Sequence, residues 1–316
     1  MAEAPTREEL EAAYCWDPSD HVPRNPETTA FRRRIRLHQA RWREAHGHPI
    51  GSQPLVPREG KPSHPVGNRL PVDYARVTGA TFVTPAALEA AGARTSGVER
   101  HQSFDHQRLW AELLWAPTLA FNLLGDLAAD LTLADRAVHA WWPETPGVVR
   151  DVRFAHSPGR LDPAYLGNLV DWSAAFELEL DGGRRGILAV VTAYHDVNHR
   201  QPANPSRLPR YREVMERSGA FARGALDAVR GTELVHLWLD HLLVLSMLQH
   251  ASDSWGWGRL VVVHAAGNTD FAGTCERYGA LLTDGSTFGS STIEMLLDAG
   301  VLPPETVAAL GARYVP

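Results

Sequence analysis

The segment AAFELELDGGRRGILAVVTAYHD, residues 174–196, contains two adjoining strand patterns and decides the fold class. In FELEL, residues 176–180, apolar and acidic side chains alternate, which predicts a strand with one face on the core. After the turn DGGRRG, the run GILAVVTAY, residues 186–194, is almost free of polar side chains. Such a run is typical of a strand covered on both faces. The segment therefore predicts a β-hairpin whose second strand is buried and ends at His195 and Asp196.

Further strands and helices are predicted on both sides of the hairpin. Strand patterns occur at residues 148–156 and 259–265. Helical patterns cover residues 84–142, interrupted by Gly and Pro, and residues 232–251, which form a long apolar helix. The order is helices, three strands, a helix, a strand and a helix. This order predicts an α/β or α+β architecture with a mixed central sheet.

The first quarter of the chain has a different character. Residues 27–46 are rich in arginine and predict a helix, whereas residues 47–78 are rich in Pro and Gly and predict an extended segment. We therefore expect an N-terminal part, residues 1–78, and a main domain, residues 79–316.

The composition of the 316-residue chain argues against several functional classes. Its formal net charge of −6 is unlike that of a protein coated with basic residues for nucleic acid. The two cysteines, Cys15 and Cys275, lie far apart, which argues against a disulfide framework and against a cysteine zinc site. No apolar run reaches the roughly 20 residues of a membrane span, so we expect a cytoplasmic protein without membrane contact.

Motifs of several enzyme classes are missing from the sequence. It contains no GxxxxGK[ST], GxGxxG, HExxH or GxSxG, which argues against nucleotide-dependent enzymes, zinc proteases and α/β-hydrolases. His236 and His241 are five residues apart on the long apolar helix, so about 140° separates them around its axis. They do not share a face, and we interpret them as polar positions of a mostly buried helix.

The N-terminal helix carries a cluster of arginines. Arg32, Arg33, Arg34 and Arg36 are a candidate contact for the phosphates of a nucleic acid. A solvated helix face is the commoner explanation of such a cluster.

The hairpin offers a candidate metal site. Glu177 projects from its first strand, and His195 and Asp196 follow the second. Carboxylate oxygens at about 2.0–2.6 Å suit Mg²⁺. Spacing alone favours a simpler interpretation, in which Glu177 and Glu179 form a solvated face and His195 and Asp196 a turn.

Several phrases of the chain resemble a bacterial branch of the PD-(D/E)XK nuclease superfamily, which has the restriction-endonuclease-like fold. The phrases HSPGR and LAFNLLGDLAADL are the more specific ones. The matching segments span most of the chain: residues 79–87, 107–131, 153–167, 174–180 and 187–196. The resemblance implies an αβββαβ core with a mixed sheet, flanked by N-terminal and C-terminal helices.

The resemblance also implies a divalent-metal site, and this sequence departs from it. In the superfamily, an Asp on the second core strand and the Glu of a Glu-x-Lys on the third hold Mg²⁺, and the Lys acts on the attacking water. We place the Asp position at Glu177, the Glu position at Val191 and the Lys position at Ala193. A further family Glu falls on Ala155. Lysine occurs once in the chain, at Lys61, so a lysine-dependent mechanism must use that residue.

Three interpretations follow. The first is a nuclease-fold protein with a degenerate metal centre, without a bound cofactor, that binds nucleic acid or a protein partner or forms a homodimer. The second is an active Mg²⁺-dependent nuclease with a rearranged site, in which Glu177 and Asp196 bind the metal and His195 activates water. The third is an unrelated α/β enzyme that uses His156 and Ser157 together with His195 and Asp196.

Overall fold

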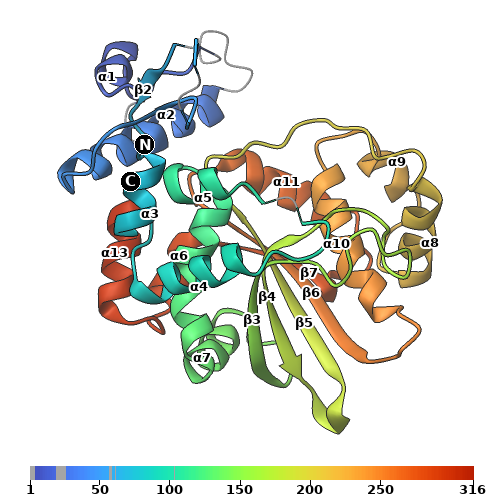
Figure 1. The fold of residues 1–316 in the computed structure, drawn as a ribbon. Coiled ribbons are helices and arrows are strands. Elements are labelled where there is room, and N and C mark those ends of the chain that lie inside the picture. Colours follow the sequence, from blue (N-terminus) through green and yellow to red (C-terminus); the bar gives the residue numbers. More distant parts are fainter. Residues whose placement is uncertain (1–3, 19–25, 57–58, 61, 103) are drawn as a thin grey trace.

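The computed structural model describes residues 4–18, 26–56, 59–60, 62–102 and 104–316. Its centre is a five-stranded mixed sheet in the order β3-β4-β5-β6-β7 (Figure 1). The strands are β3 (Val148–His156), β4 (Trp172–Glu179), β5 (Arg185–Ala193), β6 (Trp255–His264) and β7 (Phe288–Thr292). β3, β4 and β5 are antiparallel, whereas β5, β6 and β7 are parallel. The predicted hairpin, the strands beside it and the mixed sheet are confirmed, and the short polar strand β7 is an addition.

Helices cover both faces of the sheet (Figure 1). One face packs against a group of helices that includes α6, and the other against a group that includes α10. The first group is α4 (Pro85–Ser96), α6 (Ala116–Ala129), α7 (Leu131–Trp141), α12 (Ile293–Asp298) and α13 (Pro304–Tyr314). The second group is α8 (Leu208–Ser218), α9 (Ala225–Val229), α10 (Val235–Leu248) and α11 (Thr269–Gly279).

The double cover explains why β5 is so apolar. Leu188 and Val190 point into the cluster of α6, while Ile187 and Ala189 point into the cluster of α10. A strand with a hydrophobic core on each side has no solvent-exposed face for charged residues. Burying an unpaired charge costs free energy, so apolar side chains are favoured on both faces.

The N-terminal part packs on the same core. It contains α1 (Arg7–Ala12), α2 (Pro26–Ala45), β1 (Gly51–Gln53), β2 (His64–Val66) and α3 (Val72–Thr78). Phe31 and Ile35 of α2 belong to the cluster of α6, and the Gln39 amide donates a hydrogen bond of 3.0 Å to the Tyr194 hydroxyl. The predicted arginine-rich helix is confirmed, the segment after it contains β1, β2 and α3, and a domain boundary at residue 78 stays a prediction.

The candidate residues lie at one end of the strands. The hairpin turn between β4 and β5 lies at the opposite end, at the bottom of Figure 1. At the upper end, the amino end of β4 lies beside the carboxyl ends of β3 and β5. The short helix α5 (His106–Ala111) lies above this end of the sheet (Figure 1). No helix in the described ranges combines the length and the apolarity needed to cross a bilayer.

Candidate functional site

Glu177 lies between two arginines. Its Oε1 is 3.0 Å from Arg153 Nε on β3, and its Oε2 is 2.6 Å from Arg185 Nη2 on β5. These are diagonal cross-strand pairs, since Arg153 lies opposite Ala175 and Arg185 lies opposite Glu179. Both carboxylate oxygens of this buried side chain are therefore engaged by cations of the protein itself.

The strand register separates Glu177 from the positions of the expected Glu-x-Lys. Glu177 is opposite Ile187, and the last residue pair of β4 and β5 is Ala174 with Val190. Continuing that register, Val191 lies beside Ser173, four residues away from Glu177 along β4. At about 3.3 Å per residue this is more than 13 Å, too far for two ligands of one cation.

Packing closes the position of the expected Lys and partly covers that of the expected Glu. Ala193 is 1 % exposed and belongs to the core cluster of α10, and Val191 packs against the same cluster. Between them the Thr192 hydroxyl donates a hydrogen bond of 2.9 Å to the Ala116 carbonyl at the start of α6. Apolar side chains and one satisfied hydroxyl occupy the place that charged groups would need.

His195 and Asp196 lie beyond the carboxyl end of β5. His195 Nε2 is 3.3 Å from Arg36 Nη1, and burial together with the charges of Arg32 and Arg36 holds the pKa of His195 well below its ordinary value. Asp196 Oδ2 accepts a hydrogen bond of 3.1 Å from the Tyr194 amide. His195 is thus a neutral, weak base, and Asp196 stabilises a turn.

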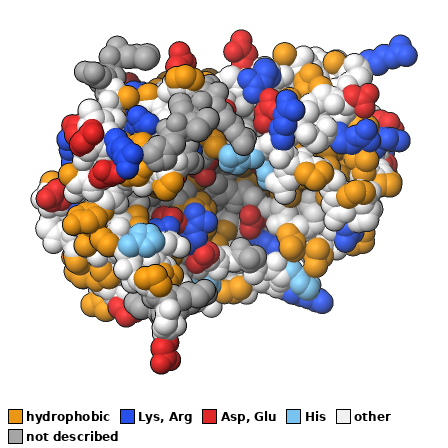
Figure 2. Space-filling model, turned by 90° about the horizontal axis from the view of Figure 1, so that it is seen from above, with side chains coloured by type: hydrophobic (Ala, Val, Ile, Leu, Met, Phe, Trp, Pro, Cys, Tyr) orange, Lys and Arg blue, Asp and Glu red, His pale blue; other side chains and the backbone are white. Residues whose placement is uncertain are grey.

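A pocket of about 430 Å³ opens at these two residues. Its walls include Trp16 and Trp115 as well as Arg36, Arg69 and Arg108. The Arg108 guanidinium lies 5.0 Å from the Trp115 ring centroid. Figure 2 shows this end of the molecule, which is hollowed near its centre with arginine, acidic and histidine side chains around the hollow.

The arginines of α2 do not form one patch. Arg36 is buried and donates a hydrogen bond of 3.0 Å to the Cys15 carbonyl. Arg33 stacks over the Trp16 ring, with its guanidinium carbon 5.1 Å from the centroid. Arg34 lines a separate pocket together with Arg41. The cluster in the sequence is therefore spread over different surroundings.

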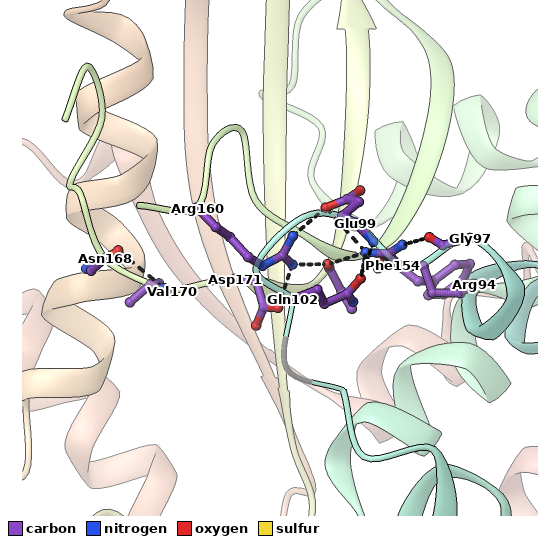
Figure 3. A network of polar contacts seen from close by, with 10 residues as sticks. Arg94, Gly97, Glu99, Gln102, Phe154, Arg160, Asn168, Val170 and Asp171 are labelled. Carbon is purple, nitrogen blue, oxygen red and sulfur yellow. Dashed lines mark hydrogen bonds and ion pairs between the residues drawn. The ribbon is translucent and has the colours of Figure 1, made fainter. Parts of the chain in front are cut away.

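A polar network that the sequence did not indicate lies at the amino end of β4 (Figure 3). The Arg160 guanidinium, 2 % exposed, binds Asp171 Oδ2 at 2.7 Å, the Ala155 carbonyl at 2.7 Å and the Glu99 carboxylate. Arg94 also pairs with Glu99, at 3.3 Å. The only signal in the sequence was the phrase HSPGR, which ends at Arg160.

Asp171 of this network influences a further carboxyl, that of Asp240. Asp171 directly precedes β4, and Asp240 lies on α10, where its carbonyl accepts a hydrogen bond of 3.0 Å from the Trp172 indole. Burial raises the pKa of Asp240 well above its ordinary value, and the charge of Asp171 raises it further. Burial also raises the pKa of Asp171. The charge of an ionised Asp171 therefore opposes the ionisation of Asp240.

The residues at the expected metal positions do not fit Mg²⁺. Glu177 is neutralised by arginines, and Val191 and Ala193 have no ligand atoms in their side chains. Across the part of the chain that the structure describes, no three His, Cys, Asp or Glu side chains are grouped to hold a metal ion. Lys61 lies outside the described residues.

The arrangement for nucleophilic catalysis is also missing at His156 and Ser157. The Ser157 hydroxyl is buried and has no hydrogen-bond partner within the described chain. No histidine therefore activates it.

Comparison with known proteins identifies the fold family. A family model described as the PD-(D/E)XK nuclease superfamily matches residues 25–316. Searches of curated proteins and of solved structures return no match. The sheet agrees with the αβββαβ order of the restriction-endonuclease-like fold, with β3 to β6 as its four strands. Because the match covers nearly the whole chain and the sheet order agrees with it, this chain belongs to the PD-(D/E)XK nuclease superfamily.

Proposed function

We propose that this chain is a nuclease-fold protein with a degenerate metal centre, which binds nucleic acid without hydrolysing it. The observation that carries the proposal is the apolar packing of the buried Ala193 and the partly buried Val191, beside Ser173. A cation needs oxygen ligands that it can reach, and charged ones above all. Of these three side chains only Ser173 has an oxygen, and Thr192 already engages it.

The pocket at the end of β5 supports the binding of a nucleic acid. Trp16 and Trp115 supply aromatic rings on which a base can stack, and Arg36, Arg69 and Arg108 supply charge for phosphates. Arg69 and Arg108 both pair with Glu112, Arg69 at 2.9 Å, so the pocket has a balanced charge. We therefore expect moderate affinity and dependence on salt, in line with the overall net charge of −6.

Fluorescence anisotropy with labelled single-stranded and double-stranded DNA and RNA tests this proposal. The protein should bind at least one of them, more weakly as the salt concentration rises, and Trp115→Ala should weaken that binding. The same mixtures with Mg²⁺ or Mn²⁺ should contain intact nucleic acid on a denaturing gel. Cleavage that depends on the protein and the metal, or the lack of binding to every probe, would defeat the proposal.

A second candidate function is an active nuclease whose metal ligands have moved. The raised pKa of Asp240, to which the charge of Asp171 contributes, favours it, because a bound cation would stabilise the ionised carboxylate. Arg160 binds Asp171 at 2.7 Å, so the cation would have to share Asp171 with this arginine. This moved site differs from the metal site expected at Glu177 and Asp196. Glu177 pairs with Ile187, which precedes Asp196 by nine residues. Calorimetric titration with Mn²⁺ separates the two functions: uptake that Asp171→Asn and Asp240→Asn abolish supports the moved site, and no uptake counts against it.

A further inference from the structure

A recess of about 630 Å³ lies next to the network of Figure 3 and apart from the pocket at the end of β5. One wall is the end of β3 and the loop after it, residues 156–163, and the other is formed by Glu99, Arg100 and His101. The volume is within the range of small-molecule sites and is far larger than a single inorganic ion needs.

Two buried side chains in the recess have polar atoms without partners. His156 and Ser157 are 5 % and 7 % exposed and line the recess. His156 Nδ1, Ser157 Oγ and Arg160 Nε have no hydrogen-bond partner among the described residues. Buried polar atoms without a partner cost free energy in the folded protein. A bound ligand that supplies the missing hydrogen bonds would explain them.

The electrostatic surroundings favour an anion. Burial in the first place lowers the pKa of His156 to about 3, together with the positive charges of four arginines: Arg153, Arg160, Arg94 and Arg185. The imidazole is therefore neutral at physiological pH. The lining carries three arginines, Arg100, Arg153 and Arg160, against two acidic residues, Glu99 and Asp162, and Arg160 is paired with Glu99. Arg100 is exposed on the opposite wall.

The backbone around the recess is held in an unusual conformation. Three non-glycine residues have positive φ there: His101 at 61°, Ala155 at 45° and Leu161 at 60°. The Ala155 carbonyl accepts hydrogen bonds from Arg160 at 2.7 Å and from Arg94 at 3.2 Å, which fix the loop. Strained backbone of this kind persists where the surrounding structure holds it, and it clusters at binding sites.

We propose that this recess binds a phosphate ester, with the phosphate against the Ser157 hydroxyl and the side chains of Arg153 and Arg100. The remaining volume accommodates the attached sugar and base. The phosphate belongs to a nucleic-acid end or to a free nucleotide, and the experiment below distinguishes these sources. The inference deepens the proposed function and rests on it where the source is a nucleic acid.

Isothermal titration of the full chain with four probes tests the inference. The probes are inorganic phosphate, a nucleoside 5′-monophosphate, and one oligonucleotide with either a 5′-phosphate or a 5′-hydroxyl. Phosphate and the monophosphate should bind, and Ser157→Ala and Arg100→Gln should each weaken them about tenfold, as expected for a hydrogen bond to a charged group. The matched controls Ser246→Ala, a buried serine of α10, and Arg136→Gln, an exposed arginine of α7, should leave the affinity unchanged.

A second measurement separates a ligand-binding role of Ser157 from a structural one. Because its hydroxyl has no partner in the free protein, Ser157→Ala should unfold at the same temperature as the wild type or slightly higher, while losing affinity. The His156 ring resonances should shift with phosphate in the wild type. A variant that loses stability and keeps its affinity would overturn the proposal.

The outcomes also separate this inference from the proposed function. If phosphate and the monophosphate bind and neither oligonucleotide does, the recess is a nucleotide site and the nucleic-acid function falls. If both oligonucleotides bind equally and phosphate does not, the nucleic-acid function stands and the phosphate site is overturned. A preference for the 5′-phosphorylated oligonucleotide that Ser157→Ala removes supports both.

Discussion

The Ser173 hydroxyl accepts a hydrogen bond of 3.0 Å from the Thr192 amide, just beyond the last residue pair of β4 and β5. The side chain of one strand thus replaces a backbone carbonyl where the two strands stop pairing. This contact lies between Val191 and Ala193, the positions of the superfamily's Glu and Lys. The hydrogen bond between Thr192 and Ser173 therefore lies at the place where the resemblance predicts a metal centre.

Restoring a lysine at Ala193 should destabilise the protein. The site is 1 % exposed and packed by the cluster of α10, so Ala193→Lys must overpack it and bury a charge without a partner. We expect the free energy of unfolding to fall by about 3 kcal/mol or more in urea titrations. Val148→Lys, at an exposed position of β3, is the control and should change it by less than about 0.5 kcal/mol. Equal effects of both substitutions would contradict the closed packing.

Replacing Glu177 should affect stability rather than metal binding. Glu177→Gln leaves Arg153 and Arg185 without their shared carboxylate, and both arginine side chains are about half exposed. Solvent screening limits the loss to about 1 kcal/mol, and high salt should reduce it. Thermal unfolding at low and high salt measures the effect. A Glu177-dependent rise in melting temperature with Mn²⁺ would show instead that this carboxylate binds metal.

The buried histidine of α10 should make stability fall in acid. His241 bonds to the Tyr278 hydroxyl at 2.9 Å and to Thr287 Oγ1 at 3.0 Å, and burial lowers its pKa from 6.5 to about 3. In the unfolded chain His241 is therefore protonated below about pH 6.5, whereas in the folded chain it is protonated only below about pH 3. This contribution is complete above pH 6.5 and is lost as the pH falls, by up to about 1.4 kcal/mol per pH unit.

The variant His241→Gln isolates this contribution. Its plot of unfolding free energy against pH should be flatter than that of the wild type between pH 6 and pH 4, whatever its absolute stability. His156, whose pKa is also lowered to about 3, contributes in the same direction and remains in the variant. Parallel plots for the two proteins would argue that His241 titrates normally.

Asp240 should have the opposite pH dependence. Burial and the charge of Asp171 raise its pKa in the folded state, so its contribution is complete below pH 3.8 and is lost as the pH rises through the raised value. Asp240→Asn stays neutral, so its melting temperature should rise relative to that of the wild type between pH 4 and pH 8. Calorimetry at both values measures this gain, with the exposed Asp227→Asn as control.

Local patterns predicted the elements of the sheet because periodicity is a property of neighbouring residues. The apolar run after DGGRRG identified β5 to within one residue, and the alternation in FELEL identified β4, which begins four residues earlier. The short strand β7 was missed, since FGSST lacks both patterns and pairs only because β6 lies beside it. Helix α10 was recognised by its length and apolarity, although it begins three residues later than expected.

The candidate site was much less predictable, because its contacts join distant parts of the chain. Sequence proximity suggested that Glu177 and Asp196 are partners, whereas the register places Glu177 with Arg153 and Arg185. The arginines of α2 looked like one group in the sequence, yet the helix turns them toward different neighbours. The network around Arg160 joins residues up to 61 positions apart, which no local pattern reports.

The sequence by itself determined the family, the order of the core elements and the absence of charge at Val191 and Ala193. These are properties of residue identity and short-range spacing. Only the tertiary structure decided that two arginines neutralise Glu177, that Ser173 is the β4 residue nearest to Val191, and that Ser157 is buried without a partner. The physical reason is that register and burial depend on how strands and helices pack against one another, and a single strand's sequence leaves both undetermined.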